Sequence, residues 1–123
     1  MGYRSYKDLI VWQKAMDLVD EIYTLVKVLP KEELFALSDQ LRRSAVSIPS
    51  NIAEGYGRRG HKEFAQFLSI ARGSLFELET QILIGIRQHF FTPDQVASAL
   101  LLCEEIGRIL TKMTASSTSD SKN

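Results

Sequence analysis

The feature that most constrains the fold is the return of apolar residues every three or four positions in four separate segments. In the first segment, residues 9–29, one apolar stripe lies directly beside a second, and together they form the wide apolar face of a helix inside a bundle. Ser5 and Asp8 make a capping-box pattern before it, and Pro30 ends it. The stripes are Leu9, Trp12, Met16, Val19, Tyr23 and Val26, and Val11, Ala15, Leu18, Ile22, Leu25 and Leu29.

The second segment has the same period from near Lys31 to about Glu54, although Pro49 lies inside it. A proline inside a helix removes one backbone hydrogen bond and costs about 3 kcal/mol unless neighbouring groups compensate. Ile48 and Ile52 stay in phase on either side of the proline, so the pattern predicts one helix kinked at Pro49.

Two longer segments follow a glycine-rich turn at residues 55–60. The third is predicted to be helical from His61 to His89, and its internal Gly73 and Gly85 predict close approach by a neighbouring helix. Thr92, Pro93 and Asp94 have the residue types that begin a helix, and apolar positions then recur to about residue 114. The last nine residues, 115–123, show no apolar period and are predicted to be a disordered tail.

These segments predict an all-α fold, an antiparallel up-down-up-down four-helix bundle. The chain of 123 residues has the length of one domain, so we expect a single domain over 1–114 and the tail over 115–123. The 15 basic residues balance the 15 acidic ones, which excludes binding to nucleic acid or membrane by net charge alone. One cysteine, no apolar run of about 20 residues and no signal-peptide layout predict a cytoplasmic protein without disulfides or membrane contact.

The residues that catalytic or metal chemistry needs are not spaced for it. Di-metal bundles use Glu-x-x-His pairs, and no glutamate here has histidine three positions later. His61 and His89 would lie about 40 Å apart on one helix. The Gly55–Gly60 run has the form G-x-G-x-x-G but follows a helix instead of a strand. We therefore expect no enzyme activity, metal, cofactor or small-molecule substrate.

Polar residues also recur with a helical period, on the second and third segments. Solvated helix faces would explain the stripe, but its many small residues favour close contact where helices or subunits meet. We favour contact, and the positions expected to support structure or assembly are Ser47, Asn51, Glu54, Arg72 and Glu77.

Positive charge is concentrated in the middle of the chain, around the turn between the second and third segments. Arginines beside an aromatic residue such as Tyr56 are suited to phosphates and a base, whereas a short basic loop is also an ordinary solvated surface. Two of the basic residues lie some 20 Å down the second helix, so one copy does not form a continuous patch. The candidate nucleic-acid contacts are Arg42, Arg43, Arg58, Arg59 and Lys62.

Four strings resemble one bacterial family: Asp8-Leu-Ile-Val-Trp-Gln-Lys-Ala15, Gln40-Leu-Arg-Arg-Ser-Ala45, Ser47-Ile-Pro-Ser-Asn-Ile-Ala-Glu-Gly55 and Ala71-Arg-Gly-Ser-Leu-Phe-Glu-Leu-Glu79. The family is that of the four-helix-bundle proteins encoded by intervening sequences in 23S ribosomal RNA genes, and the accessory proteins of diversity-generating retroelements look like its relatives. The resemblance implies a cytoplasmic bundle that assembles into a ring, commonly a pentamer, with no established enzymatic activity. It also implies binding to RNA or DNA.

Three hypotheses follow. The first is a non-enzymatic, ring-forming bundle that engages structured RNA or a nucleoprotein partner. The second is a protein–protein scaffold without a nucleic-acid role. The third is an enzyme with a composite site between subunits, for instance Glu54 with His61 of a neighbour.

Overall fold

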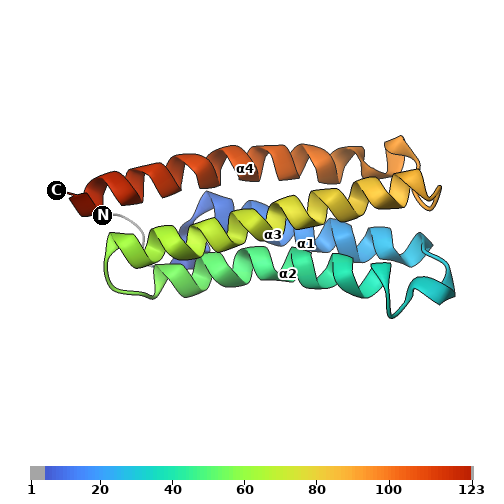
Figure 1. Cartoon of the computed structure of the whole chain (residues 1–123), viewed down its shortest axis with the longest axis horizontal. Coiled ribbons are helices and arrows are strands. Elements are labelled where there is room, and N and C mark those ends of the chain that lie inside the picture. Colours follow the sequence, from blue (N-terminus) through green and yellow to red (C-terminus); the bar gives the residue numbers. More distant parts are fainter. Residues whose placement is uncertain (1–4, 123) are drawn as a thin grey trace.

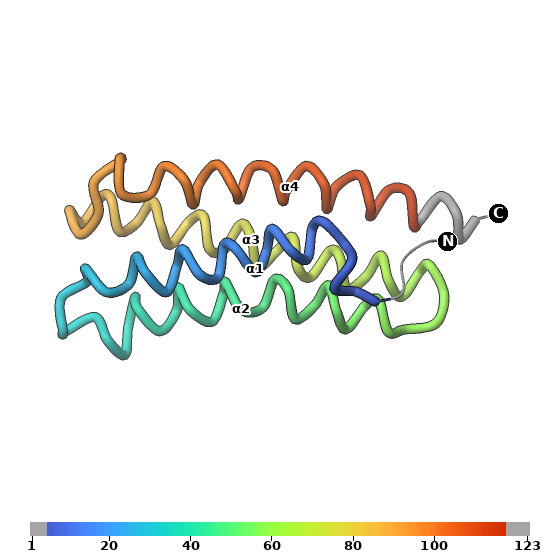
Figure 2. The backbone as a smooth tube through the Cα atoms, turned by 180° about the vertical axis from the view of Figure 1, so that it is seen from behind, coloured from blue at the N-terminus to red at the C-terminus, as the bar shows by residue number. Residues whose placement is uncertain are grey.

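Four α-helices account for most of the chain: α1 (Ile10–Leu25), α2 (Leu37–Tyr56), α3 (His61–Arg87) and α4 (Pro93–Lys122). The computed structural model describes the backbone of residues 5–122 and the side chains of residues 5–117. Over that range it contains no strand, and the all-helical prediction is confirmed. Consecutive helices run in opposite directions along one long axis (Figures 1 and 2). The helix α1 packs on α2 and α4, and α3 packs on the same two helices from the other side.

The predicted apolar stripes build the core. On α1 the buried stripe is the one that contains Leu18 and Ile22, while the neighbouring stripe with Met16 and Tyr23 is partly exposed. The largest fully buried side chains come from all four helices, so each stripe contributes to one continuous core. They include Leu18, Ile22, Leu41, Ile48, Ile52, Leu68, Leu75, Leu78, Ile82, Ile106 and Leu110.

The start of the second helix differs from the prediction. A short 3₁₀ turn covers Lys31–Glu33, and the α-helix begins six residues later than expected, at Leu37. Ala36 has φ −120° and ψ −105°, which breaks the helical path, and a Glu33 carboxylate oxygen accepts the Leu37 N–H at 3.3 Å. From Leu37 the helix continues through Pro49 to Tyr56. A kink at Pro49 stays a prediction.

The first helix also begins later than its capping pattern suggested. The Ser5 hydroxyl accepts the Lys7 N–H at 3.1 Å, and this contact caps the 3₁₀ turn Tyr6–Asp8 instead of α1. Leu9 then has extended backbone angles, and α1 begins at Ile10.

The turn between α3 and α4 reverses the chain through His89, whose φ of 64° is the one positive φ at a non-glycine residue in the described part of the chain. The Phe90 N–H donates to the Gly85 carbonyl at 2.9 Å and the His89 N–H to the Ile86 carbonyl at 2.9 Å, which is the Schellman arrangement. This turn brings the Phe91 ring against Gly85, where an added Cβ would overlap the ring.

The prediction that a neighbouring helix closely approaches Gly73 and Gly85 of α3 was therefore wrong. Gly85 is approached by Phe91 of the following turn and not by a neighbouring helix. Gly73 has no atom within 4 Å of an added Cβ. The close helix–helix approach occurs at Gly55, where an added Cβ would lie 2.6 Å from the Phe67 Cβ.

The last helix extends beyond the predicted boundary at residue 114. Its backbone stays helical from Pro93 to Lys122, because backbone hydrogen bonds continue the helix where the apolar period has stopped. The predicted boundary at 114 is thus not a helix end. No helix in the described range is long and apolar enough to cross a membrane.

Candidate nucleic-acid interface and exposed faces

The polar stripe on α2 contacts α3 of the same chain. The Ser44 hydroxyl donates to the Gln81 side-chain oxygen at 3.0 Å, and both residues are buried. The hydroxyls of Ser47 and Ser74 share a hydrogen bond of 2.8 Å. The Asn51 amide donates to the Ser47 carbonyl at 2.8 Å and to its hydroxyl at 3.0 Å. The bonds of Ser44 and Ser47 thus join α2 to α3, whereas those of Asn51 stay within α2. No buried side-chain N or O atom is unpaired among the described residues.

The charged candidates for assembly have local partners or are exposed. A Glu54 carboxylate oxygen and the Arg58 guanidinium form an ion pair of 2.7 Å one helical turn apart. Arg72 stacks over the Phe76 ring at 5.0 Å, and Glu77 is exposed on α3. Among the side chains of residues 5–117, none of these three candidates has a polar contact with another helix, unlike Ser47.

Three of the five candidate nucleic-acid contacts already have partners within the chain. Arg42 donates to the Ser38 hydroxyl at 3.0 Å, and Arg43 pairs with Asp39 at 3.0 Å. Arg58, besides its bond to Glu54, lies 5.0 Å from the centre of the Phe67 ring. These contacts reduce the freedom of all three guanidinium groups to bind phosphate.

The remaining two candidates, Arg59 and Lys62, are exposed. Arg59 lies in the turn between α2 and α3, which is at one end of the bundle (Figure 1), and Lys62 is the second residue of α3. Neither forms an ion pair or a side-chain hydrogen bond with another described residue. Beside them lies a hollow of about 210 Å³ lined by aromatic, glycine and basic residues, with the rings of Tyr56 and Phe64 edge to face at 6.3 Å. We call Arg58–Lys62 together with this hollow the basic tip.

The structure does not bring the five cations into one patch. Arg42 and Arg43 lie in the second turn of α2, whereas the basic tip follows the end of that helix about 20 Å away. The candidates therefore form two sites in one copy of the chain.

One exposed face, between α1 and α2, is predominantly apolar. A hollow of about 310 Å³ there has no charged residue in its lining, and it adjoins a second hollow that contains Tyr23 and Arg42. Met16, Tyr23 and Val46 are 39%, 45% and 40% exposed. We call the two hollows together the α1–α2 face. Its lining residues are Tyr6, Trp12, Met16, Val19, Tyr23, Asp39, Arg42, Arg43, Val46, Ser47, Pro49, Ser50 and Ala53.

A second exposed face, between α3 and α4, is a groove of about 520 Å³. The Phe76 ring, 48% exposed, and the Cys103 side chain line it together with charged side chains. Burial and the nearby Glu104 charge raise the pKa of the Glu79 carboxyl. Burial, followed by the charges of Glu79 and Glu21, raises the pKa of the Cys103 thiol to about 12. We call this the α3–α4 groove; its residues include Arg72, Phe76, Glu79, Cys103, Glu104 and Arg108.

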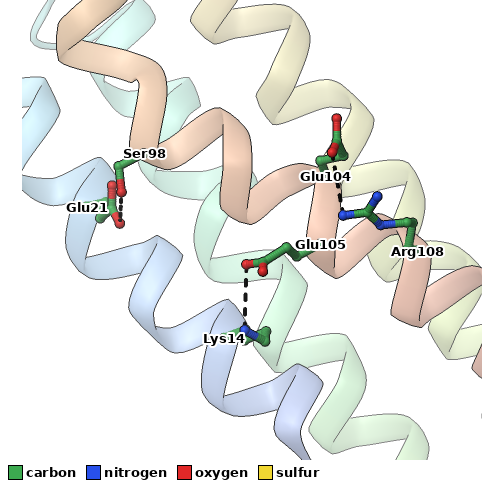
Figure 3. Close-up of polar contacts among 6 residues, drawn as sticks. All are labelled: Lys14, Glu21, Ser98, Glu104, Glu105 and Arg108. Carbon is green, nitrogen blue, oxygen red and sulfur yellow. Dashed lines mark hydrogen bonds and ion pairs between the residues drawn. The ribbon is translucent and has the colours of Figure 1, made fainter.

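The contact between α1 and α4 is polar instead (Figure 3). The Ser98 hydroxyl donates to a Glu21 carboxylate oxygen at 2.9 Å, and the Lys14 ammonium lies 3.6 Å from a Glu105 oxygen. The same view shows the pair between Glu104 and Arg108, 3.5 Å apart on α4. Large apolar side chains are also exposed outside these two surfaces, among them Phe35 at 90% and Leu101 at 60%.

Metal-ligating side chains do not gather in the described part of the chain: no group of three or more His, Cys, Asp or Glu residues there could hold a metal ion. His61 and His89 lie near opposite ends of α3, which spans 27 residues.

A model of the 23S rRNA-intervening sequence protein family matches residues 7–112. No curated protein matches the chain. A crystal structure of a protein of unknown function, from the S23 ribosomal protein family of Bacteroides thetaiotaomicron, is similar with a TM-score of 0.79 and 28% identity. The alignment covers 85% of this chain and 98% of that one.

Proposed function

Because this chain belongs to the 23S rRNA-intervening sequence protein family, we propose that it is a non-enzymatic, self-associating bundle that binds structured RNA in the cytoplasm. The copies form a ring, for which we favour five, and each presents its basic tip to the RNA. The observation that carries RNA binding is that Arg59 and Lys62, exposed beside an aromatic hollow, have no ion-pair or side-chain hydrogen-bond partner among the described residues.

The chemistry of the basic tip suits a nucleic acid. Exposed cations without intramolecular partners can neutralise phosphates, and this releases counterions. Aromatic rings beside them offer a surface on which an unpaired base can stack. One tip carries little charge, so a ring that places several tips at one end would supply the affinity that a neutral chain lacks.

A scaffold without a nucleic-acid role is the second candidate. It is favoured by the two exposed apolar sides of the bundle, which are suited to self-association. Pairing of Arg42, Arg43 and Arg58 within the chain also supports it, because paired guanidinium groups contribute less to phosphate binding.

Fluorescence anisotropy separates these candidates. A structured RNA and a matched DNA duplex are titrated at about 50 and 200 mM salt, because phosphate binding weakens steeply with salt. We expect RNA binding that the Arg59→Ala/Lys62→Ala variant weakens about tenfold or more, with a smaller salt slope.

The matched control is Lys27→Ala/Arg87→Ala, which removes the same charge from the opposite end of the bundle. Equal losses in both variants would indicate a net-charge effect and not a site. If neither nucleic acid binds at the lower salt while the protein remains a defined oligomer, the scaffold hypothesis replaces RNA binding.

A further inference from the structure

The hollow at the basic tip is bounded by two helices and by the turn that joins them at one end of the bundle (Figure 1). Its lining residues are Gly55 and Tyr56 at the end of α2, Arg58 and Gly60 in the turn, and His61 and Phe64 at the start of α3. Gly60 has a φ of 89°, and no atom lies within 4 Å of a Cβ added there. The hollow therefore opens to solvent beside Gly60.

The size and shape of the hollow suit one flat ring system. Its volume is about 210 Å³, below the roughly 300–1,000 Å³ of pockets that enclose drug-sized ligands. The planes of the Tyr56 and Phe64 rings meet at 85°, with the ring centres 6.3 Å apart. A planar group that stacks on one of these rings therefore meets the other edge to face, which is a favourable aromatic contact. Both residues are partly exposed, so a ligand can reach them while the helices stay folded.

The charge around the hollow is only slightly positive. Between residues 54 and 64 the cations Arg58, Arg59 and Lys62 stand against the carboxylates of Glu54 and Glu63. The affinity of a protein for a nucleic-acid duplex comes mainly from cations that neutralise several phosphates. So small a surplus supplies little of that affinity, and a nucleic acid that binds here must also contact the aromatic rings.

Arg58 is held in position beside these rings. Its guanidinium pairs with a Glu54 carboxylate oxygen at 2.7 Å and lies 5.0 Å from the centre of the Phe67 ring. The side chains of the pair are 46% and 51% exposed, so the pair orients Arg58 without contributing much to stability. A guanidinium has several N–H donors, and the bond to Glu54 leaves donors for the edge of a base.

These features distinguish an unpaired base from a paired one. In a duplex the neighbours in the stack cover both faces of each base, so the rings of Tyr56 and Phe64 would find no free face to contact. An unpaired base in a loop or overhang exposes its face, and aromatic side chains are its usual partners. The exposed Arg59 and Lys62 can then neutralise the adjacent phosphates.

We propose that the hollow of the basic tip takes up one unpaired base of an RNA loop or overhang, with Tyr56 and Phe64 contacting the base and Arg59 and Lys62 contacting the adjacent phosphates. This inference rests on the RNA binding in the proposed function and names the class of RNA that the tip selects. RNA with unpaired bases should bind more tightly than RNA that carries the same phosphates without them.

Two RNA hairpins that differ only in their loops test the proposal. One has a short loop of adenosines, and the other has the same loop built from abasic riboses, so both have the same stem and the same number of phosphates. Fluorescence anisotropy measures the affinity of the wild-type protein for each hairpin at low salt. We expect about tenfold tighter binding of the adenosine loop, which is the effect of stacking one base on an aromatic ring.

Variants separate contacts with the base from contacts with the phosphates. Phe64→Leu and Tyr56→Leu each keep an apolar side chain but remove a ring, so each should remove most of the preference for the adenosine loop. Arg59→Ala/Lys62→Ala should instead weaken binding of both hairpins by the same factor. The matched control is Phe76→Leu, the same change about 18 Å further along α3, which should alter neither affinity. Circular dichroism checks that each variant keeps its helices.

Free adenosine monophosphate separates an RNA site from a pocket for a small nucleotide. It offers the same base but lacks the adjacent phosphates that Arg59 and Lys62 would contact. As a competitor it should displace the adenosine-loop hairpin only at concentrations far above the Kd of the hairpin. Displacement at concentrations near that Kd would overturn the assignment to RNA.

The remaining outcomes are distinct. Equal wild-type affinities for the two hairpins, both weakened by Arg59→Ala/Lys62→Ala, would overturn recognition of the base and leave RNA binding intact. A preference for the adenosine loop that both Phe64→Leu and Tyr56→Leu retain, or that Phe76→Leu also loses, would overturn its placement in this hollow. If neither hairpin binds at low salt, RNA binding itself fails and this inference fails with it.

Discussion

At the scale of single residues, Gly85 and Gly73 of α3 have different surroundings. Gly85 lies against the Phe91 ring, whereas Gly73 has open space around it. We expect Gly85→Ala to lower the free energy of unfolding by about 2 kcal/mol, because the new methyl group overlaps the Phe91 ring. Gly73→Ala should raise it by about 1 kcal/mol, because the site is open and alanine favours the helix. Urea denaturation of the two variants checks the pair, and equal effects would contradict the assigned packing.

The sequence alone could not distinguish these two glycines. Both lie inside the same predicted helix, and close approach by a neighbouring helix was predicted for each. The difference arises from the positive φ of His89, which turns the chain so that Phe91 reaches back over Gly85. Histidine adopts a positive φ more often than most non-glycine residues but less readily than glycine, so it is a weak signal for such a turn.

Cys103 provides a pH-dependent prediction at the same scale. Its pKa rises from an ordinary value of 9.0 to about 12 in the folded chain, so the folded state favours the neutral thiol. Its contribution to stability is therefore complete below about pH 9 and is lost as the pH rises from about 9 toward 12. We expect the wild type to lose more stability between pH 8 and pH 10 than Cys103→Ala, which cannot ionise.

Urea midpoints of both proteins at about pH 8, 9 and 10 measure this difference. Other groups titrate in the same range, but they do so in both proteins and cancel in the comparison. If the urea midpoints of the two proteins change in parallel with pH, burial does not hold the Cys103 thiol neutral.

At the scale of helices, the buried bond between Ser44 and Gln81 joins α2 to α3. Ser44→Ala removes the donor and leaves the Gln81 amide buried without its partner, so we expect a loss of about 1–3 kcal/mol. Replacing both as Ser44→Ala/Gln81→Leu should recover much of that loss, because no unpaired polar group remains. A double-mutant cycle from thermal or urea unfolding measures the coupling, and additive effects would contradict the bond.

Periodicity predicted the helices better than it predicted their ends. The spacing of Leu34 and Leu37 suits an α-helix, yet a 3₁₀ turn and the break at Ala36 lie before Leu37. The signal for the later start is Glu33, whose carboxylate accepts the Leu37 N–H at the helix entrance. The end of α4 was predicted too early, at residue 114, because the apolar period stops there. The end of an apolar stripe marks the end of a buried face, but the backbone hydrogen bonds of the helix continue to Lys122.

At the scale of the whole molecule, the sequence located the basic residues but overestimated how many are free. The partners of Arg42, Arg43 and Arg58 are all four residues earlier, at Ser38, Asp39 and Glu54. Pairs at this spacing face each other on a helix, so the pairing was readable from the sequence. The sequence could not show that the α1–α2 face and the α3–α4 groove lie on opposite sides of the bundle, because their placement depends on how the four helices pack.

Self-association predicts how stability depends on concentration. If assembly occurs only between folded chains, mass action raises the melting temperature as protein concentration increases. We expect this rise in the wild type. Calorimetry over a hundredfold range of concentration checks it, and a melting temperature that does not change with concentration would contradict self-association.

The contact of Phe91 with Gly85 has a consequence for how related sequences diverge. A larger residue at position 85 is tolerated only after the ring at 91 has been lost, and a ring at 91 is accommodated only over a residue without a side chain. The two positions should therefore change together among descendants of this gene, and intermediates that change one position alone should be rare.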